Sequence, residues 1–138
     1  AGLKFTDFDL YRLSLISRAG RVIFNGRDEV YAAGQLMGAC GGIGSFYNLV
    51  PELFVAIDTL CRSGRYVEAR KVQDRVNDLI RTVLAYPMLP AMKVILGWTG
   101  IAAGPCVAPR RALTDSEQVR LRSDLVNAGF AHLTHEPA

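Results

Sequence analysis

The sequence predicts an α/β fold, in which short parallel strands are followed by a region of helices. Strand and helix alternate over the first third of the chain, with strands expected at residues 2–5, 21–25 and 41–45 and helices at 7–16 and 28–37. Strand–helix–strand alternation with short connections indicates parallel strands joined by right-handed crossovers. The first third is therefore expected to form a small parallel sheet.

Helices are expected over most of the remaining sequence. Pro51 suits the first position of a helix, and Gly64 suits the residue just past its end. Apolar residues recur at helical spacing after Tyr66, and Thr114 with Glu117 forms a capping-box pattern. The predicted helices cover residues 51–62, 66–86 and 88–98, and a last helix opens at Thr114 and ends before Gly129.

A sheet of three parallel strands is incomplete as a folding unit. Parallel sheets are covered on both faces, and open sheet edges invite pairing with other chains. The sequence supplies only two crossover helices for this purpose. We therefore expect the strands to be part of a larger sheet, most simply the last strands of a barrel.

The composition fits one folded domain and argues against two classes of partner. The chain has 138 residues, half of them apolar, and its net charge of +3 comes from scattered basic residues, so no nucleic-acid footprint is expected. No apolar run approaches the roughly 20 residues of a membrane span, and no signal peptide is expected. The three cysteines match no zinc or redox spacing, which favours reduced thiols in a cytoplasmic protein.

Polar side chains follow each expected strand, at the edge of a parallel sheet where active sites lie. They are Lys4 and Thr6 after the first strand, Asn25, Gly26, Asp28 and Glu29 after the second, and Ser45, Tyr47 and Asn48 after the third. Lys4 has the most specific chemistry. Burial in a strand disfavours a charged ammonium, and a neutral amine can form a Schiff base with a carbonyl.

Each of these residues also has a simpler structural explanation. Lys4 fits a strand-end lysine whose ammonium reaches water. Asp28 and Glu29 fit the start of a helix, where carboxylates suit the positive end of the dipole. Ser45 and Asn48 fit capping positions. The single residues therefore do not decide the chemistry.

Two further patterns are weaker still. The glycines of residues 38–44 resemble a phosphate loop, but a helix precedes them where a Rossmann fingerprint needs a strand. His132 and His135 would hold a metal only with a third ligand, and none is evident in the sequence. No metal site is therefore expected.

Three segments taken together resemble a known family. Residues 2–7 read Gly-Leu-Lys-Phe-Thr-Asp, residues 25–29 read Asn-Gly-Arg-Asp-Glu, and residues 41–48 read Gly-Gly-Ile-Gly-Ser-Phe-Tyr-Asn. In this order they resemble the N-acetylneuraminate lyase and dihydrodipicolinate synthase superfamily, whose members are lysine-dependent class I pyruvate aldolases on a TIM barrel. The resemblance runs to about Gly129, includes residues 104–106, and is nearest to the N-acetylneuraminate lyase branch.

The resemblance implies that the chain is the C-terminal part of a TIM (β/α)8 barrel followed by a helical extension. Residues 1–62 would form the last three βα units, and residues 63–138 an extension packed on the barrel. The missing N-terminal half would carry the loop that binds the pyruvate carboxylate and the tyrosine that shuttles protons, a role that Tyr47 does not match. Because the sequence starts at Ala1 without methionine, we expect a processed or truncated product with little activity alone.

The resemblance also implies the functional residues. Lys4 would be the Schiff-base lysine that condenses with the keto group of pyruvate. The positions that bind substrate match Thr6, Gly26, Asp28, Glu29 and Ser45. Carboxylates accept hydrogen bonds from several hydroxyls at once, and glycine lets the backbone come close to a ligand.

The expected activity is cleavage of a 2-keto-3-deoxy sugar acid, such as N-acetylneuraminate, to pyruvate and an aldehyde sugar, with no metal or organic cofactor. The Asp28–Glu29 pair with nearby Ser45 favours the lyase branch. Two alternatives stay open: a sister activity (2-keto-3-deoxygluconate aldolase, dehydratase or dihydrodipicolinate synthase), or a non-catalytic fragment or pseudoenzyme that acts by assembly with a partner chain. Relatives are commonly tetramers, so a homo-oligomer is expected.

Overall fold

A computed structural model describes residues 1–135 of the chain. They fall into two compact units, Ala1–Asn77 and the residues from Asp78 onward. The first unit contains all the strands, and the second is helical. One helix, α4 (Tyr66–Leu84), has residues in both units.

The first unit is built on a three-stranded parallel sheet in the order β1–β2–β3, as the sequence predicts. The strands are β1 (Gly2–Phe5), β2 (Val22–Asn25) and β3 (Gly41–Gly42). Lys4 pairs with Phe24, and Phe24 with Gly41, so the strands end near one another at their carboxyl ends. The prediction of a third strand as far as residue 45 is wrong, because the chain turns after Gly42 and forms a 3₁₀ helix, η2 (Phe46–Asn48).

The helices of the first unit are α1 (Leu10–Arg18), α2 (Tyr31–Leu36) and α3 (Pro51–Arg62). The helix predicted at residues 7–16 spans Leu10–Arg18 instead, and it begins later because the Asp9 carboxylate caps it by accepting the N–H of Arg12. The helix predicted from residue 28 opens as a 3₁₀ turn, η1 (Asp28–Val30), and becomes α-helical only at Tyr31. Helix α3 has the predicted bounds, with Pro51 in its first turn.

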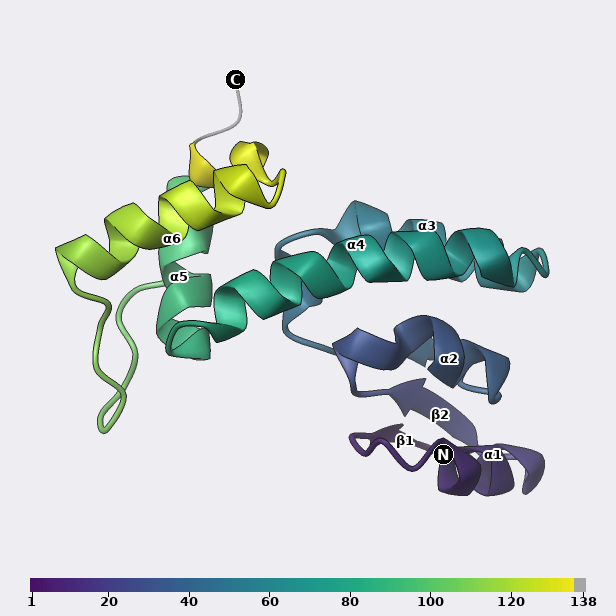
Figure 1. The fold of residues 1–138 in the computed structure, drawn as a ribbon. Coiled ribbons are helices and arrows are strands. Elements are labelled where there is room, and N and C mark those ends of the chain that lie inside the picture. The colour runs from purple at the N-terminus through teal and green to yellow at the C-terminus, as the bar shows by residue number, and fades with distance from the viewer. Residues whose placement is uncertain (136–138) are drawn as a thin grey trace. The chain divides into compact units, whose positions relative to one another are not determined.

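Helices α1 and α2 contact β2 and each other, and they cover one face of the sheet (Figure 1). Phe5 and Ile23 point to that face and form an apolar core with Leu13 of α1 and with Ala39. Because side chains alternate along a strand, Lys4 and Val22 lie on the opposite face, and both are exposed. The sheet is therefore covered on one face only by the helices of its own unit.

The second unit contains α5 (Met88–Trp98), α6 (Asp115–Asn127) and a short 3₁₀ helix, η3 (Ala131–Thr134), which contact one another. The predicted capping box of α6 is confirmed: the Thr114 hydroxyl accepts the N–H of Glu117, and the Glu117 carboxylate accepts the N–H of Thr114. The buried apolar residues of the second unit include Met92, Ile95, Leu121, Leu125, Phe130 and Leu133.

Residues 100–111 form neither helix nor strand, as predicted. The predicted boundary between barrel units and helical extension, at residues 62 and 63, stays a prediction. Within residues 1–135, no single helix is long and apolar enough to cross a membrane. Helices α4 and α5 reach the necessary length and composition only as a bent pair.

Candidate functional site

The ends of β1 and β2 are packed tightly against each other around Gly26. Its N–H donates to the carbonyl of Phe5 at 2.8 Å. A methyl group on Gly26 would collide with the Thr6 hydroxyl and would lie 3.0 Å from the Cε atom of Lys4. Only glycine therefore lets the second strand end approach Lys4 and Thr6, and these three predicted site residues are neighbours.

The Lys4 side chain is exposed, so the expectation that it is buried is wrong for residues 1–135. The physical reason is its place on β1, which is an edge strand with β2 as its only neighbour in the sheet. Lys4 also points to the sheet face that α1 and α2 do not cover. Desolvation of this amine would need further protein on that face.

Asp28 has the opposite environment, since only 6% of it is exposed. Its Oδ2 atom accepts the N–H of Phe46 at 2.9 Å, whereas Oδ1 is buried without a hydrogen-bond partner among the described residues. A methyl group on Gly44 would overlap this carboxylate, so the glycine is needed for the approach of the two loops. Asp28 thus joins the turn after β2 to the turn after β3.

Burial raises the pKa of the Asp28 carboxyl above its ordinary value of 3.8 and outweighs the opposing effect of the Phe46 N–H. The Glu29 carboxylate raises this pKa further, whereas the Lys4 ammonium and the N–H of Ser45 lower it. Glu29, Lys4 and the Ser45 N–H therefore all lie within electrostatic reach of the Asp28 carboxyl. Glu29 and Ser45 are half-buried.

The structure thus brings the sequence-predicted site residues to one edge of the sheet. Lys4 and Thr6 both lie against Gly26, and Lys4, Glu29 and the backbone N–H of Ser45 all act on the Asp28 carboxyl. An exposed amine beside a buried carboxylate and a half-buried hydroxyl suits a ligand that carries both a carbonyl and hydroxyl groups. The assignment of catalytic and binding roles to these residues stays a prediction.

Asn25 and Arg27 of the same turn were not assigned a catalytic or binding role from the sequence. Asn25 is fully buried, and its Nδ2 donates to the Arg27 carbonyl at 2.6 Å, which fixes the backbone between Gly26 and Asp28. The Arg27 guanidinium lies 4.4 Å from the ring centroid of Phe8 and so links the turns after β2 and β1. A polar residue in a buried strand is the sequence signal for Asn25, while nothing in the sequence signals the Arg27 contact.

Helix α4 supplies two further residues that the sequence reading missed. Gln73 is buried and donates to the backbone carbonyl of Asp28 at 2.9 Å, and Asn77 donates to that of Glu29 at 3.1 Å. The turn that carries both acidic residues is therefore held from a helix far along the chain.

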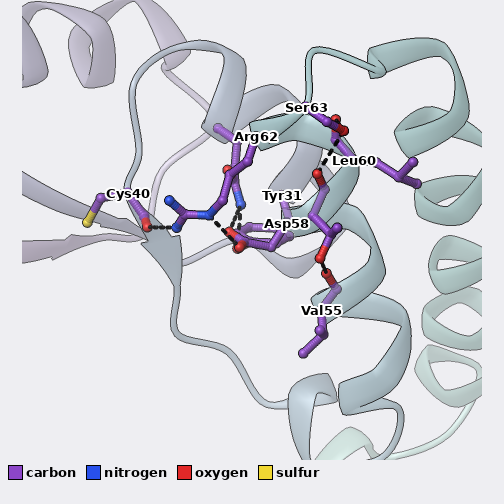
Figure 2. Close-up of polar contacts among 9 residues, drawn as sticks. Tyr31, Cys40, Val55, Asp58, Leu60, Arg62 and Ser63 are labelled. Carbon is purple, nitrogen blue, oxygen red and sulfur yellow. Dashed lines mark hydrogen bonds and ion pairs between the residues drawn. The ribbon is translucent and has the colours of Figure 1, made fainter.

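A second polar network lies on helices α2 and α3, away from the carboxyl ends of the strands (Figure 2). The Asp58 carboxylate of α3 accepts from the Tyr31 hydroxyl at 3.1 Å, from Gln35 Nε2 at 2.6 Å and from Arg62 Nε at 2.6 Å. Arg62 also donates to the carbonyl of Cys40 at 3.2 Å. The network joins α3 to α2 and to the residue that precedes β3.

Two further residues near the strand ends, Tyr47 and Cys40, have structural contacts. Tyr47 stacks on Phe54 at 3.8 Å between ring centroids, and burial raises the pKa of its hydroxyl. Cys40 donates its thiol hydrogen to the carbonyl of Ile23 at 3.2 Å. Among residues 1–135, no group of three or more His, Cys, Asp or Glu side chains is arranged to hold a metal ion.

Comparison with known families decides the relationship that the three segments suggest. Residues 1–128 match the model of the dihydrodipicolinate synthetase family. The chain belongs to this family. The match confirms the resemblance drawn from the ends of the three strands, and it extends through α5 and α6 to residue 128.

Within the family, the chain is similar to N-acetylneuraminate lyases. The N-acetylneuraminate lyase of Rhizobium meliloti (strain 1021) is 36% identical over 123 residues, which are 88% of this chain and 41% of that protein. CdNal from Clostridium difficile, solved in complex with mannosamine, has a TM-score of 0.87 at 30% identity, over 92% of this chain and 44% of that one. The N-acetylneuraminate lyase from Fusobacterium nucleatum complexed with pyruvate has a TM-score of 0.84 at 30% identity, over 91% and 44%.

The chain therefore spans less than half the length of these dihydrodipicolinate synthetase family members. Its parallel strands with crossover helices, followed by further helices, are consistent with part of a TIM barrel and a helical region.

Proposed function

We propose that the chain is the C-terminal part of a Schiff-base aldolase that cleaves a 2-keto-3-deoxy sugar acid, such as N-acetylneuraminate, to pyruvate and an aldehyde sugar. In this proposal residues 1–62 are the last three βα units of the barrel and residues 63–138 are the helical extension. The observation that carries it is the gathering of Lys4, Asp28 and Ser45 at one sheet edge in a chain that is similar to N-acetylneuraminate lyases.

Each residue has a role that follows from its chemistry. The Lys4 amine attacks the keto carbon, and loss of water leaves an iminium ion that accepts the electron pair of the breaking carbon–carbon bond. The aldehyde sugar leaves as its hydroxyl gives up a proton, and the resulting enamine is protonated and hydrolysed to pyruvate. Thr6 and Gly26 would line the site beside the lysine, and Asp28, Glu29 and Ser45 would bind the sugar hydroxyls.

The exposed face of the sheet supports the view that the catalytic centre is completed by further protein. A Schiff-base lysine works best when it is desolvated, whereas Lys4 is exposed within residues 1–135. We infer that the rest of a barrel covers this face and supplies the carboxylate anchor and the proton-transfer group. Without a positioned acid–base group the rate would fall by about 100- to 10,000-fold, so residues 1–138 alone are expected to have little activity.

Borohydride trapping tests the assignment of Lys4. The natural polypeptide that contains these residues is incubated with pyruvate, reduced and digested, and the adduct is mapped by mass spectrometry. We expect the adduct on Lys4, no adduct in Lys4→Arg, and a fall in kcat/KM of about 1,000-fold or more in that variant.

Lys71→Arg is the matched control, because Lys71 is an exposed lysine of α4 and lies in the same unit as Lys4. This control should keep the adduct and the activity. An adduct on a different lysine, or the absence of any adduct in the parent protein, would contradict the assignment.

Two alternatives remain, and each has its own test. A panel of 2-keto acids scored by pyruvate release separates the lyase from a sister activity, which is favoured if N-acetylneuraminate is inert and another substrate reacts. A non-catalytic role in assembly is favoured by the open sheet edges at β1 and β3, which can pair with another chain. Light scattering on residues 1–138 tests it, because a stable monomer would argue against assembly.

A further inference from the structure

The side-chain amide of Gln73 is fully used at the start of α2. Gln73 is 6% exposed, and its Oε1 atom accepts the N–H of Ala32 at 3.0 Å. Its Nε2 group donates to the carbonyl of Asp28 at 2.9 Å and to Oδ1 of Asn77 at 3.0 Å. One side chain thus bonds both to the residue that bears the buried carboxylate and to the first turn of the following helix.

Asn77 extends this arrangement by one residue. It lies one turn after Gln73 on α4, and its Nδ2 group donates to the carbonyl of Glu29 at 3.1 Å. The carbonyls of Asp28 and Glu29 are therefore held side by side by two amides that are themselves hydrogen-bonded to each other. The pair acts as a single clamp on two successive peptide groups.

The turn needs such a clamp because its own backbone does not complete a helix. Val30 has φ −129° and ψ 27°, which interrupts the helical path between the 3₁₀ turn and α2. The N–H of Ala32 belongs to the first turn of α2, where no intrahelical acceptor exists. Gln73 satisfies that orphan donor and holds the carbonyl before the interruption, so the conformation of the turn depends on α4.

We propose that Gln73 and Asn77 are positioning residues that set the affinity of the site for the sugar half of the substrate. This inference rests on the proposed function, in which Asp28 and Glu29 bind sugar hydroxyls. Neither amide touches the substrate in this proposal. Both act through the backbone of Asp28 and Glu29, which we call the acidic turn. Lys4 lies on β1, which pairs with β2 and places Phe5 in the core with Leu13 of α1. Loss of the clamp should therefore weaken sugar recognition and leave pyruvate recognition intact.

The test measures the two halves of the substrate separately in the natural polypeptide. KM is determined for the sugar acid in cleavage, and KM for pyruvate is determined in the condensation direction. For Gln73→Leu we expect about a tenfold increase in KM for the sugar acid and a change of less than about twofold in KM for pyruvate. Gln73→Glu keeps the acceptor for Ala32 but loses the donor to Asp28, so it should show an intermediate increase.

Gln35→Leu is the matched control, because Gln35 is a part-buried glutamine of α2 that bonds to Asp58 and not to the acidic turn. It should disturb the packing of α2 without a selective change in either KM. Should Gln73→Leu fail to fold, Asn77→Ala gives the same test on a half-buried residue.

Equal changes in both KM values, or no change in either, would overturn the positioning role while the parent enzyme still releases pyruvate. A parent protein that releases pyruvate from no 2-keto acid would instead overturn the proposed function, and this inference with it. A selective increase in the Gln35→Leu control equal to that in Gln73→Leu would also overturn it, since the effect would then reflect general loosening of α2.

Discussion

Asp28 and Asp58 are both partly or fully buried aspartates of the same unit, yet their carboxylates are used in opposite ways. Asp58 accepts hydrogen bonds from three side chains, and the Arg62 hydrogen bond lowers the pKa of its carboxyl below 3.8. Asp28 accepts one backbone N–H, keeps one oxygen without a partner among the described residues, and has its pKa raised by burial.

The difference separates a structural carboxylate from one with capacity left for a ligand. The hydrogen-bonding capacity of Asp58 is consumed within α2 and α3, so this residue has little left to offer a substrate. A buried oxygen without a partner is costly for stability, and such groups concentrate at functional sites. The comparison therefore favours Asp28 over Asp58 as a binding group, in agreement with the proposed function.

The largest expected effect comes from closing the space beside Asp28. In Gly44→Ala the new methyl group overlaps the Asp28 carboxylate, so the turn after β3 must move and the Phe46 N–H bond is lost. We expect a loss of about 2 kcal/mol in the free energy of unfolding, measured by urea denaturation.

Gly41→Ala is the control for that variant, because a methyl group there would meet Phe24 at an ordinary contact distance of 3.4 Å. Its effect should stay within about 0.5 kcal/mol. Similar losses in the two variants would show that the site beside Asp28 is not specially constrained.

A medium effect is expected from Asp58→Asn. The substitution removes the negative charge and turns one acceptor into an amide donor that faces the donors of Tyr31, Gln35 or Arg62. Because Arg62 is largely exposed, we expect a loss of no more than about 1 kcal/mol at pH 7. The lowered pKa means that stability from this carboxylate is present above pH 3.8 and is lost as the pH falls through the folded-state pKa.

The smallest effect, of opposite sign, is expected from Asp28→Asn. The asparagine oxygen can keep the Phe46 N–H bond, while the buried charge beside Glu29 disappears. The melting temperature at pH 7 should therefore stay the same or rise slightly. Because the pKa is raised, the native carboxyl stabilises the fold most below pH 3.8, and this stabilisation is lost as the pH rises through the folded-state pKa.

Thermal melts of both variants between pH 3 and pH 8 check these two signs. The Asp58→Asn protein should lose the part of the parent's acid sensitivity that comes from Asp58. The difference in melting temperature between Asp28→Asn and the parent should become smaller as the pH falls. Identical pH profiles for the two variants would remove the distinction between the carboxylates. Under the proposed function, Asp28→Asn should weaken sugar binding in spite of its stability.

Much of the fold could be predicted from local signals. Helix α3 begins at a proline in its first turn, and α6 begins at a capping box, and both signals are independent of tertiary contacts. The start of α1 was predicted too early, because Asp7 and Asp9 are both possible caps and only the structure shows that Asp9 accepts the Arg12 N–H. The third strand was predicted too long, because the approach of Gly44 to Asp28 is a tertiary constraint.

The site was predictable where chemistry follows directly from a strand end, and not where it depends on distant neighbours. Gly26, Asp28 and Ser45 were identified from their place after the strands. The exposure of Lys4 could not be predicted, because burial depends on which protein covers the sheet face. The contacts of Gln73 and Asn77 could not be predicted either. These side chains bind backbone carbonyls 45 and 48 residues earlier, and every residue has a backbone carbonyl, so the sequence does not indicate which one is bound.

Helix α4 is continuous from Tyr66 to Leu84, although the compact units meet after Asn77. A truncation at that boundary would look sensible from compactness alone, yet it would leave the last four carbonyls of the shortened helix without N–H donors. Asn77 would become the terminal residue and Gln73 would lie in the last turn, where helices fray. Shortened versions of this protein should therefore keep α4 whole, so that Gln73 and Asn77 keep their hydrogen bonds to the carbonyls of Asp28 and Glu29.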